Sequence, residues 1–392
     1  MSDKKKIRLL YFHPTIVFGG AERTSTLILE NLDKTIFDVV FVTKKEVFPP
    51  LSVGKTVYID DLGVNDGFAG FSALIKDARI IGRLIKDESD LAFGMLHYGC
   101  IVLATLKFFF GSKVRIIVSP RTPSKDGIKF HLKDKPSGRI IWNLMVRFFC
   151  RYSDGIIVAS EGLREECIVK YQAERKKIAT VNNSVDVESI EKLSAESSDC
   201  EDLPGTYVIS TAGRLAAEKN IDVLFKAFAT LRKDMKAKLW VIGEGPERSH
   251  LESLAASLSI ENDVVFFGFQ ENPYKYIKRS DAFVHTSLFE GFGNVILEAM
   301  ACGVPVVATD CPFGPREMID NMKNGILVPM SDEHALAEAL KVVLESDELR
   351  RNLVARAFKG LENFSAAKMV TGYEHFFLEI AKADSTKRGW IR

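Results

Sequence analysis

Short apolar runs rich in β-branched and aromatic residues alternate along this chain with longer segments whose apolar residues recur every three or four positions. The short runs predict buried strands, and the longer segments, such as 21–32 and 71–86, predict amphipathic helices. Regular alternation of the two is typical of parallel α/β units, so we expect an α/β fold. The expected strands are 7–12, 38–43, 57–60, 91–96, 114–119, 155–159, 178–182, 207–212, 238–242, 264–267, 282–286, 304–309 and 325–328.

The clearest break in this pattern lies at 192–205, where Ser, Glu and Asp prevail and Pro204 and Gly205 precede a new apolar run. This composition is typical of a linker. With 392 residues the chain is also too long for one compact core. We therefore expect an N-terminal domain at 1–191, a C-terminal domain at 206–370 and a final helix at 371–392 that can cross back to the first domain. In open parallel sheets, ligands bind beyond the carboxyl ends of the strands.

The composition, with 46% apolar and 27% charged residues, is that of a globular protein and excludes disordered, collagen-like and disulfide-scaffold classes. The six cysteines are scattered without a CxxC pair, which indicates reduced thiols. The charged start runs directly into a strand, and no apolar run approaches the roughly 18 residues that span a bilayer. We expect neither a signal peptide nor a membrane span, and hence a cytoplasmic protein.

The formal net charge of +1 conceals an uneven distribution. Residues 1–185 contain 29 Lys and Arg against 20 Asp and Glu, whereas residues 186–392 contain 24 against 32. The first half is therefore basic and the second half acidic. An acidic second half and the absence of a nucleic-acid-binding motif argue against a nucleic-acid partner.

Two loops of the second half have the composition of an anion site. Gly213 and Arg214 follow the strand at 207–212, and Lys219 comes just before the next predicted helix. A helix start supplies amides and the positive end of its dipole, and the two cations supply full charge. Ordinary solvated charges around a loop would give the same pattern. After the strand at 238–242, Gly243 and Gly245 allow close backbone approach to a ligand or a tight turn.

A third loop carries more information. Glu290 lies in the loop after the strand at 282–286, and Glu298 lies inside the helix predicted at 294–302. Gly291 and Gly293 make the turn between them, and free amides are expected near Asn294 and Val295. A diphosphate on those amides, a ribose on one glutamate and a sugar on the other would form a nucleotide-sugar pocket. Two surface glutamates in an ordinary loop are the alternative interpretation.

This block resembles the signature of the retaining glycosyltransferases of family 4. The resemblance rests on Glu290 and Glu298 with seven residues between them, on Gly291, Phe292 and Gly293 inside that span, and on the segment 301–307 behind it. It continues in the second half through Gly213, Arg214, 218–220, 243–246, Gly268 and Phe269, and in the first half through 19–23, Asn183 and Asp186. The resemblance implies a GT-B fold, in which two Rossmann-like domains face a cleft, with the donor in the second domain and the acceptor in the first.

The resemblance also implies roles for individual residues. Arg214 and Lys219 would hold the donor diphosphate, Glu298 the ribose hydroxyls, and Glu290 the transferred sugar beside the reacting carbon. Phe269 lies where the family's backbone meets the nucleobase, and Gly19 and Gly20 would approach the phosphates when the cleft closes. Many relatives have a histidine after the fifth strand, where this chain has Ser119, Pro120 and Arg121. Arg121 is therefore the candidate for an anion or sugar contact there, with His97 as a weaker alternative.

The expected reaction is the transfer of a hexose or N-acetylhexosamine from a nucleotide sugar, UDP-linked by expectation, with retention of configuration. The cations and helix amides are aimed at charge that develops on the leaving diphosphate. No Asp-x-Asp pair lies in a suitable loop, so we expect a metal-independent enzyme without a cofactor. Glu290 could act as a nucleophile, but the resemblance favours a front-face mechanism in which it positions the sugar.

The acceptor is indicated by the segment 101–151, which holds eleven basic residues and only Asp126 and Asp134 as acids. Around Lys107 and between Arg139 and Arg151, cations interleave with large apolar side chains, a composition that suits an anionic membrane surface. A core-facing helix with a basic outer face is the alternative. The segment 310–317 resembles family members that act on lipid carriers. We therefore expect a glycan or polyprenyl-diphosphate-linked acceptor, in envelope polysaccharide or glycan assembly, and attachment to the inner face of the plasma membrane.

Other functions remain to be weighed against this one. A nicotinamide dehydrogenase is excluded because the first strand is not followed by GxGxxG. A nucleotide-sugar epimerase would share the two-domain shape but not the spaced glutamates. A non-catalytic nucleotide-sugar-binding or membrane-surface scaffold protein of the same fold stays open as the alternative from another class.

Overall fold

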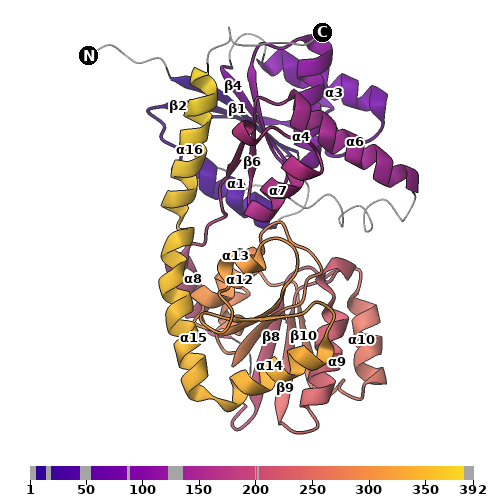
Figure 1. Ribbon diagram of the computed structural model, residues 1–392, viewed down its shortest axis with the longest axis vertical. Coiled ribbons are helices and arrows are strands. Elements are labelled where there is room, and N and C mark those ends of the chain that lie inside the picture. The colour runs from indigo at the N-terminus through magenta and orange to yellow at the C-terminus, as the bar shows by residue number, and fades with distance from the viewer. Residues whose placement is uncertain are drawn as a thin grey trace. The chain divides into compact units, whose positions relative to one another are not determined.

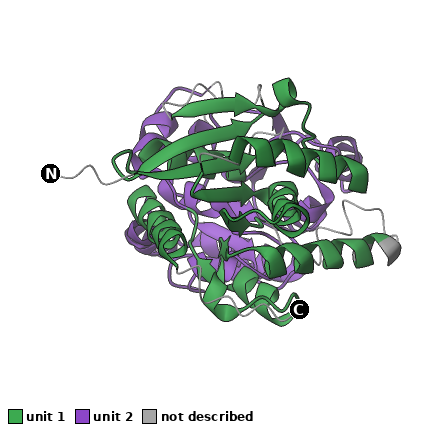
Figure 2. Cartoon of the chain, turned by 90° about the horizontal axis from the view of Figure 1, so that it is seen from above, with its two compact units in different colours: residues 1–183, 366–392 green, residues 184–365 purple. Residues whose placement is uncertain are grey.

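The computed structural model describes residues 6–14, 19–44, 54–85, 89–121, 136–198, 200 and 203–383. These residues form two compact units, coloured separately in Figure 2. The first unit contains the described residues up to Asn183 together with those from Ala366 onward, and the second runs from Ser184 to Ser365. Each unit has its own parallel sheet, so the expected α/β architecture is confirmed.

The first unit is built on a seven-stranded sheet in the order β3-β2-β1-β4-β5-β6-β7, with every pair parallel. The strands are β1 (Ile7–His13), β2 (Phe37–Thr43), β3 (Lys55–Tyr58), β4 (Leu91–Met95), β5 (Arg115–Ser119), β6 (Gly155–Val158) and β7 (Ile178–Thr180). The helices are α1 (Gly20–Asn31), α2 (Ile59–Leu62), α3 (Phe71–Ile85), α4 (Leu96–Phe110), α6 (Pro136–Tyr152), α7 (Glu161–Val169), the 3-10 turn η1 (Arg175–Lys177) and α16 (Ala366–Lys382).

The second unit is built on a six-stranded parallel sheet in the order β10-β9-β8-β11-β12-β13. Its strands are β8 (Tyr207–Ala212), β9 (Ala237–Ile242), β10 (Val264–Gly268), β11 (Ala282–His285), β12 (Val306–Thr309) and β13 (Ile326–Val328). Its helices and 3-10 turns are α8 (Val187–Ser194), η2 (Ala217–Lys219), α9 (Ile221–Leu231), α10 (Arg248–Ser257), α11 (Tyr274–Ile277), α12 (Asn294–Ala301), α13 (Pro315–Met318), α14 (Glu333–Glu345), α15 (Asp347–Gly360) and η3 (Leu361–Phe364).

The last helix, α16, returns to the first unit and covers one face of its sheet (Figure 1). The ring of Phe93 on β4 lies 5.9 Å from that of Tyr373 and 5.2 Å from that of Phe377, both on α16. A Cβ on Gly155 of β6 would lie 2.7 Å from the ring of Phe376, so the glycine lets the helix approach the sheet closely. The helix α16 is therefore part of the first unit's core, although it follows the second unit in the sequence.

The division between the units differs from the expected linker because α8 belongs to the second unit. Ile190 on α8 is buried, and the helix packs against α11 and α12. Asn272 donates to the carbonyl of Leu193 at 2.8 Å, and Arg279 donates to Ser198 Oγ at 2.6 Å. The described residues at the start of the polar segment that reads as a linker are thus held on the second unit, and the unit boundary falls between 183 and 184 instead of after 191.

The strand order of the second unit places its candidate site. Chain order runs outward in both directions from the neighbouring strands β8 and β11, so the winding reverses between them. At such a switch point the loops after the two strands separate and leave room for a ligand. The loop after β8 carries Arg214 and Lys219, and the loop after β11 carries Glu290. Segments about 70 residues apart in sequence therefore meet at one edge of the sheet.

Candidate active site

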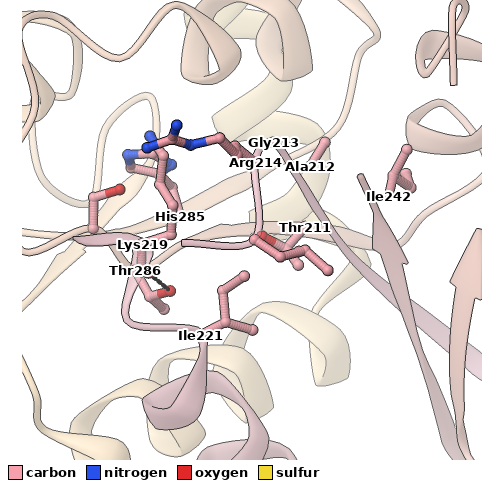
Figure 3. A pocket seen from close by; sticks show the side chains of 11 residues that line it. Thr211, Ala212, Gly213, Arg214, Lys219, Ile221, Ile242, His285 and Thr286 are labelled. Atoms are coloured by element: carbon pink, nitrogen blue, oxygen red, sulfur yellow. Dashed lines mark hydrogen bonds between the residues drawn. The ribbon is translucent and has the colours of Figure 1, made fainter. Parts of the chain in front are cut away.

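A small pocket opens at this switch point (Figure 3). It is lined by Thr211, Ala212, Gly213, Arg214, Leu215, Lys219, Ile221, Ile242, His285, Thr286 and Ser287. Two of the lining side chains are cations, and one is an imidazole. The anion site expected from Gly213, Arg214 and Lys219 therefore corresponds to a real concavity whose polar lining comes from two adjacent strand ends.

Close packing of two loops explains why glycine occupies positions 243 and 245. Gly213 and Gly243 have φ values of 139° and 141°, which favour glycine. A Cβ on Gly243 would lie 1.9 Å from the carbonyl oxygen of Gly213, and one on Gly245 would lie 2.2 Å from that of Leu215. The loops after β8 and β9 also exchange backbone bonds, including Leu215 N to Glu244 O at 2.9 Å. The close approach that Gly243 and Gly245 allow is therefore between two loops.

The two cations are held differently. Arg214 Nη2 bonds to Glu218 Oε1 at 2.9 Å, and about half of the Arg214 side chain remains exposed. Lys219 ends the turn η2, and its Nζ lies 2.5 Å from Glu290 Oε1. An exposed guanidinium keeps donors for an incoming anion, whereas the ammonium already neutralises a carboxylate.

Glu290 is the most strongly held carboxylate of the site. Its Oε1 accepts hydrogen bonds from Lys219 Nζ at 2.5 Å and from Ser287 Oγ at 2.8 Å. Burial alone would raise the pKa of this carboxyl, but the ammonium of Lys219 and the imidazole of His285 outweigh it. The pKa of Glu290 consequently lies well below its usual range, and the group is ionised at neutral pH.

The turn that carries Glu290 is fixed from both neighbouring strands. Thr286 Oγ1 donates to the carbonyl of Lys219 at 2.8 Å, as the dashed line in Figure 3 shows, and the Leu288 amide donates to the carbonyl of Glu218 at 2.9 Å. Thr309 at the end of β12 donates to the carbonyl of Ser287 at 2.8 Å. These bonds tie the 286–290 turn to η2 and to β12, so Glu290 and Lys219 are positioned together.

His285 is a site residue that the sequence did not single out. It is the last residue of β11 and only 4% exposed, and its Nε2 lies 3.1 Å from Glu290 Oε1. In the sequence it closes an apolar run, so it reads as part of a buried strand. His285 ends a strand directly before the loop that carries Glu290, and this position in the sequence could have identified it as a candidate site residue.

The start of α12 differs in part from the expectation. Gly293 has a φ of 97° and precedes the helix, whose start has no side-chain cap. Phe292 is buried with its ring 5.9 Å from that of Phe364, so any contact of this residue with a donor would come from its backbone. The predicted residues Gly291, Gly293, Asn294, Val295 and Glu298 lie on this turn and helix rather than in the lining of the pocket.

Phe269 follows Gly268 at the end of β10, the edge strand of the sheet. Two-thirds of its surface is exposed. The ring is therefore available to stack on a planar group, although the resemblance implied only a backbone contact at this position. β9 separates β10 from β8, so Phe269 and Arg214 follow strands that are not direct neighbours in the sheet.

Arg121, in the first unit, is committed to protein partners. It is buried at the carboxyl end of β5, where its Nη1 donates to the Tyr373 hydroxyl at 2.9 Å and its Nη2 donates to Asn183. It thereby joins β5, the segment after β7 and α16. This arrangement favours a structural role, so its expected contact with an anion or sugar stays a prediction.

Gly19 and Gly20 lie where α1 begins, after β1. Glu22 in the first turn of α1 is buried, and its Oε1 lies 3.3 Å from Nε2 of His13, the last residue of β1. Burial is the main cause that lowers the pKa of His13. The glycine pair is thus followed by a buried polar contact that fixes the helix start to the strand end. The ring of the weaker candidate His97 packs at a tilt of 46° against that of Trp142, with ring centroids 4.6 Å apart.

The comparison with known proteins decides the family. The model "Glycosyltransferase Family 4" matches residues 18–189, and the model "Glycosyl transferases group 1" matches residues 200–360. A relative from Campylobacter jejuni, N-acetylgalactosamine-N,N'-diacetylbacillosaminyl-diphospho-undecaprenol 4-alpha-N-acetylgalactosaminyltransferase, is 31% identical over 268 residues, which are 68% of this chain and 70% of the relative. The chain belongs to the family 4 glycosyltransferases.

Further similarities agree with this glycosyltransferase assignment. N-acetyl-alpha-D-glucosaminyl L-malate synthase of Bacillus anthracis is 28% identical over 93% of this chain and 95% of its own length. Sucrose-phosphate synthase from Thermosynechococcus elongatus superposes with a TM-score of 0.79 at 17% identity, covering 97% of this chain and 100% of that one. Anabaena HepE in complex with UDP superposes with a TM-score of 0.70 at 18% identity, covering 96% and 100%. These structures confirm the GT-B fold of the glycosyltransferase.

Within the glycosyltransferase, the structure thus brings Gly213, Arg214 and Lys219 together and bonds Glu290 to Lys219. Phe269 and Glu298 lie on other elements of the same unit, and Gly19, Gly20 and Arg121 lie in the other unit. Across the described part of the chain, none of the helices has the length and apolar character needed to cross a membrane.

Proposed function

We propose that this glycosyltransferase moves a hexose or N-acetylhexosamine from a UDP-sugar, with retention of anomeric configuration and without a metal ion. The acceptor is a hydroxyl of a glycan or of a polyprenyl-diphosphate-linked saccharide. The observation that carries the proposal is the Lys219–Glu290 pair at 2.5 Å beside the exposed Arg214. The pair supports the proposal because positive charge suited to a leaving diphosphate lies next to an ionised carboxylate suited to a sugar.

The cations support the donor half of the proposal. When the bond between sugar and diphosphate breaks, negative charge grows on the diphosphate, and donors fixed beforehand stabilise it most effectively. Arg214 retains exposed donors, and its guanidinium geometry suits phosphate oxygens. The name of the C. jejuni relative includes a diphospho-undecaprenol-linked saccharide, and the structure of Anabaena HepE is a complex with UDP. Both names agree with the donor and acceptor classes proposed here.

Glu290 supports a positioning role over a nucleophilic one. Its Oε1 is engaged by two donors, which withdraw electron density and hold the carboxylate in one orientation. The same constraint would slow attack on the anomeric carbon by that oxygen. Oε2 can then accept a hydrogen bond from a sugar hydroxyl while the negative charge stabilises the cationic transition state. This arrangement favours the front-face mechanism, in which the acceptor enters on the side that the diphosphate leaves.

The test is a donor panel. UDP-linked and GDP-linked hexoses and N-acetylhexosamines are added to the purified protein, and thermal shift and nucleotide release are measured. The proposal expects stabilisation and slow hydrolysis with at least one UDP-sugar, both reduced in K219A. Binding without turnover for any donor or acceptor would favour the non-catalytic scaffold, and neither binding nor turnover would contradict the proposal.

We also propose that the first unit attaches to the inner face of the plasma membrane, so the enzyme is cytoplasmic and peripheral. The rings of Phe71 on α3 and Phe109 on α4 lie 5.7 Å apart, and Phe108 is 4.8 Å from Phe109 and 5.5 Å from Phe148 on α6. Phe71, Phe108 and Phe109 are about half exposed or more. This aromatic patch therefore runs across three helices.

Cations flank the aromatic patch, as an anionic lipid surface requires. The guanidinium of Arg79 lies 5.5 Å from the ring of Phe110, and that of Arg151 lies 5.9 Å from the ring of Tyr152. Lys107, which the sequence placed on the basic surface, is instead buried in an ion pair with Asp154, since α4 turns this position toward β5 and β6. Residues 122–135, which belong to the basic segment expected at the membrane surface, lie outside the described part of the chain.

A further inference from the structure

His285 is a buried imidazole at the centre of the site to which the transfer proposed above assigns no step. Its Nε2 lies 3.1 Å from Glu290 Oε1, yet this nitrogen is fully buried and has no hydrogen-bond partner among the residues that the structure describes. A buried polar atom without a partner is costly, because it has given up water without a replacement. The arrangement therefore needs an explanation.

The explanation lies in the capacity of one carboxylate oxygen. Each oxygen of a carboxylate offers about two lone-pair directions to donors. On Glu290 Oε1 these are taken by Lys219 Nζ at 2.5 Å and Ser287 Oγ at 2.8 Å. His285 is close enough to be a third donor but is not aligned for a bond. His285 therefore lies beside an oxygen whose two lone-pair directions are already taken by other donors.

Of these two donors, Lys219 is the one whose positive charge a diphosphate would attract. It lines the pocket at the strand end where the proposed function places the donor diphosphate. An ammonium attracted by two phosphate charges would move from Glu290 toward them and vacate one lone pair of Oε1. Ser287 cannot fill that place because its hydroxyl already bonds to the same oxygen.

We propose that His285 is a positioning residue that takes the place of Lys219 on Glu290 Oε1 when the donor diphosphate draws the ammonium away. This step rests on the proposed function, because it needs the diphosphate. The replacement keeps the carboxylate hydrogen-bonded and oriented during the transfer.

The surroundings of His285 suit this role. Its backbone pairs with Ala308 of β12, so the ring is anchored to a strand end and not to a flexible loop. The charged groups that face it are Glu290 and Lys219, with Arg214 across the pocket. In this buried setting a bond to the carboxylate is stronger than it would be in water. His285 is already one of the causes that lower the pKa of Glu290.

The kinetic test uses three substitutions with steady-state transfer as the readout. In H285Q the amide nitrogen stands near the position of Nε2, in H285N the amide is too short to reach Oε1, and H285L fills the space without a donor. We expect H285L and H285N to lower kcat about 10- to 100-fold, the range for a hydrogen bond to a charged group. The KM for the donor should change little, and H285Q should recover most of the kcat.

The matched control is H250L. His250 also pairs with a carboxylate, Asp222, at 2.7 Å, but on the surface of the same unit. The H250L substitution should leave kcat unchanged. A wild-type kcat in H285L, or an H285Q variant as slow as H285N, would overturn the proposal.

A second measurement does not depend on turnover. Urea unfolding is followed for the wild type, H285L, K219M and the double variant K219M/H285L. With Lys219 absent, His285 should bond to Glu290, so H285L should lower the unfolding midpoint more in the K219M background than in the wild type. Equal shifts in both backgrounds would overturn the replacement even if the protein proves to be an active transferase. Failure of the donor panel alone would overturn the proposed function and leave this result to stand by itself.

Discussion

At Glu290 two opposing effects act on the same proton. Burial favours the neutral acid, whereas the ammonium of Lys219 and the imidazole of His285 favour the carboxylate, and these two neighbours outweigh burial. The negative charge of Glu290, on which the proposed transfer depends, is therefore maintained by neighbours that also fix its position. The electrostatics of the site depend on a few contacts around one oxygen.

This balance gives a pH prediction. Because the pKa of Glu290 is lower in the folded protein than its unfolded value of about 4.3, its ionisation stabilises the fold above that pH. The stabilisation begins to decline as the pH falls below the unfolded pKa and is fully lost only below the folded pKa. The wild type should therefore exceed E290Q in urea midpoint at pH 7, and the difference should shrink by pH 4. A difference that grows toward acid would contradict the ion pair.

Arg214 should contribute to donor affinity more than to stability, because half of it is exposed and its partner Glu218 lies on the same loop. We expect R214A to weaken UDP binding about 10-fold or more, the loss expected when a charged hydrogen bond to a phosphate is removed. Isothermal titration with UDP measures this. The control is R248A, an arginine of the same unit held by Glu244 and Glu252 at 2.6 Å each, which should bind UDP like the wild type.

Elements were the part of the molecule that the sequence predicted best. All thirteen expected strands are present within a few residues of their expected limits, because buried parallel strands read as uninterrupted apolar runs. The errors concern which neighbour an element packs against. The helix α8 reads as the end of the first domain but is held by Asn272, and Lys107 reads as a surface cation but pairs with Asp154. Such contacts join positions that are distant in sequence, so no local pattern encodes them.

The loops after β8 and β9 give a prediction at this scale. Gly213 and Gly243 have almost the same φ, but a Cβ on Gly213 meets nothing within 4 Å, whereas one on Gly243 meets the Gly213 carbonyl at 1.9 Å. G213A should therefore lose only the backbone strain, about 1–3 kcal/mol. G243A should lose clearly more, because two backbones must also separate. Urea unfolding compares the two, and an equal loss would contradict the close contact of the loops.

At the scale of the whole molecule, the uneven charge of the chain acquires a structural context. The basic half forms most of the first unit, whose helices α3, α4 and α6 present the aromatic patch. The acidic half forms most of the second unit, and the anion site proposed there depends on the two cations that line its pocket, Arg214 and Lys219, and not on the net charge. Local arrangement decides what each unit can bind.

The aromatic patch and its flanking cations predict membrane binding that weakens as salt rises and when the exposed phenylalanines are replaced. The protein should sediment with vesicles that contain anionic lipid, and less so as ionic strength rises, because salt screens the cations. Replacing Phe108 and Phe109 together by Ser should reduce binding further. Neutral phosphatidylcholine vesicles are the control and should bind weakly. Binding that is unchanged at high salt would contradict the contribution of the cations.

The central claim is that the Lys219–Glu290 centre transfers a sugar with retention and without a metal ion. The most direct measurement is the anomeric configuration of the product, read by proton NMR after reaction of an α-linked UDP-sugar, active in the donor panel, in the presence of a chelator. The account predicts an α-linked product from the wild type and a loss of product formation of about 100-fold or more in E290Q, as for removal of a group that stabilises transition-state charge. A β-linked product, or product that forms only after a divalent metal ion is restored, would contradict it.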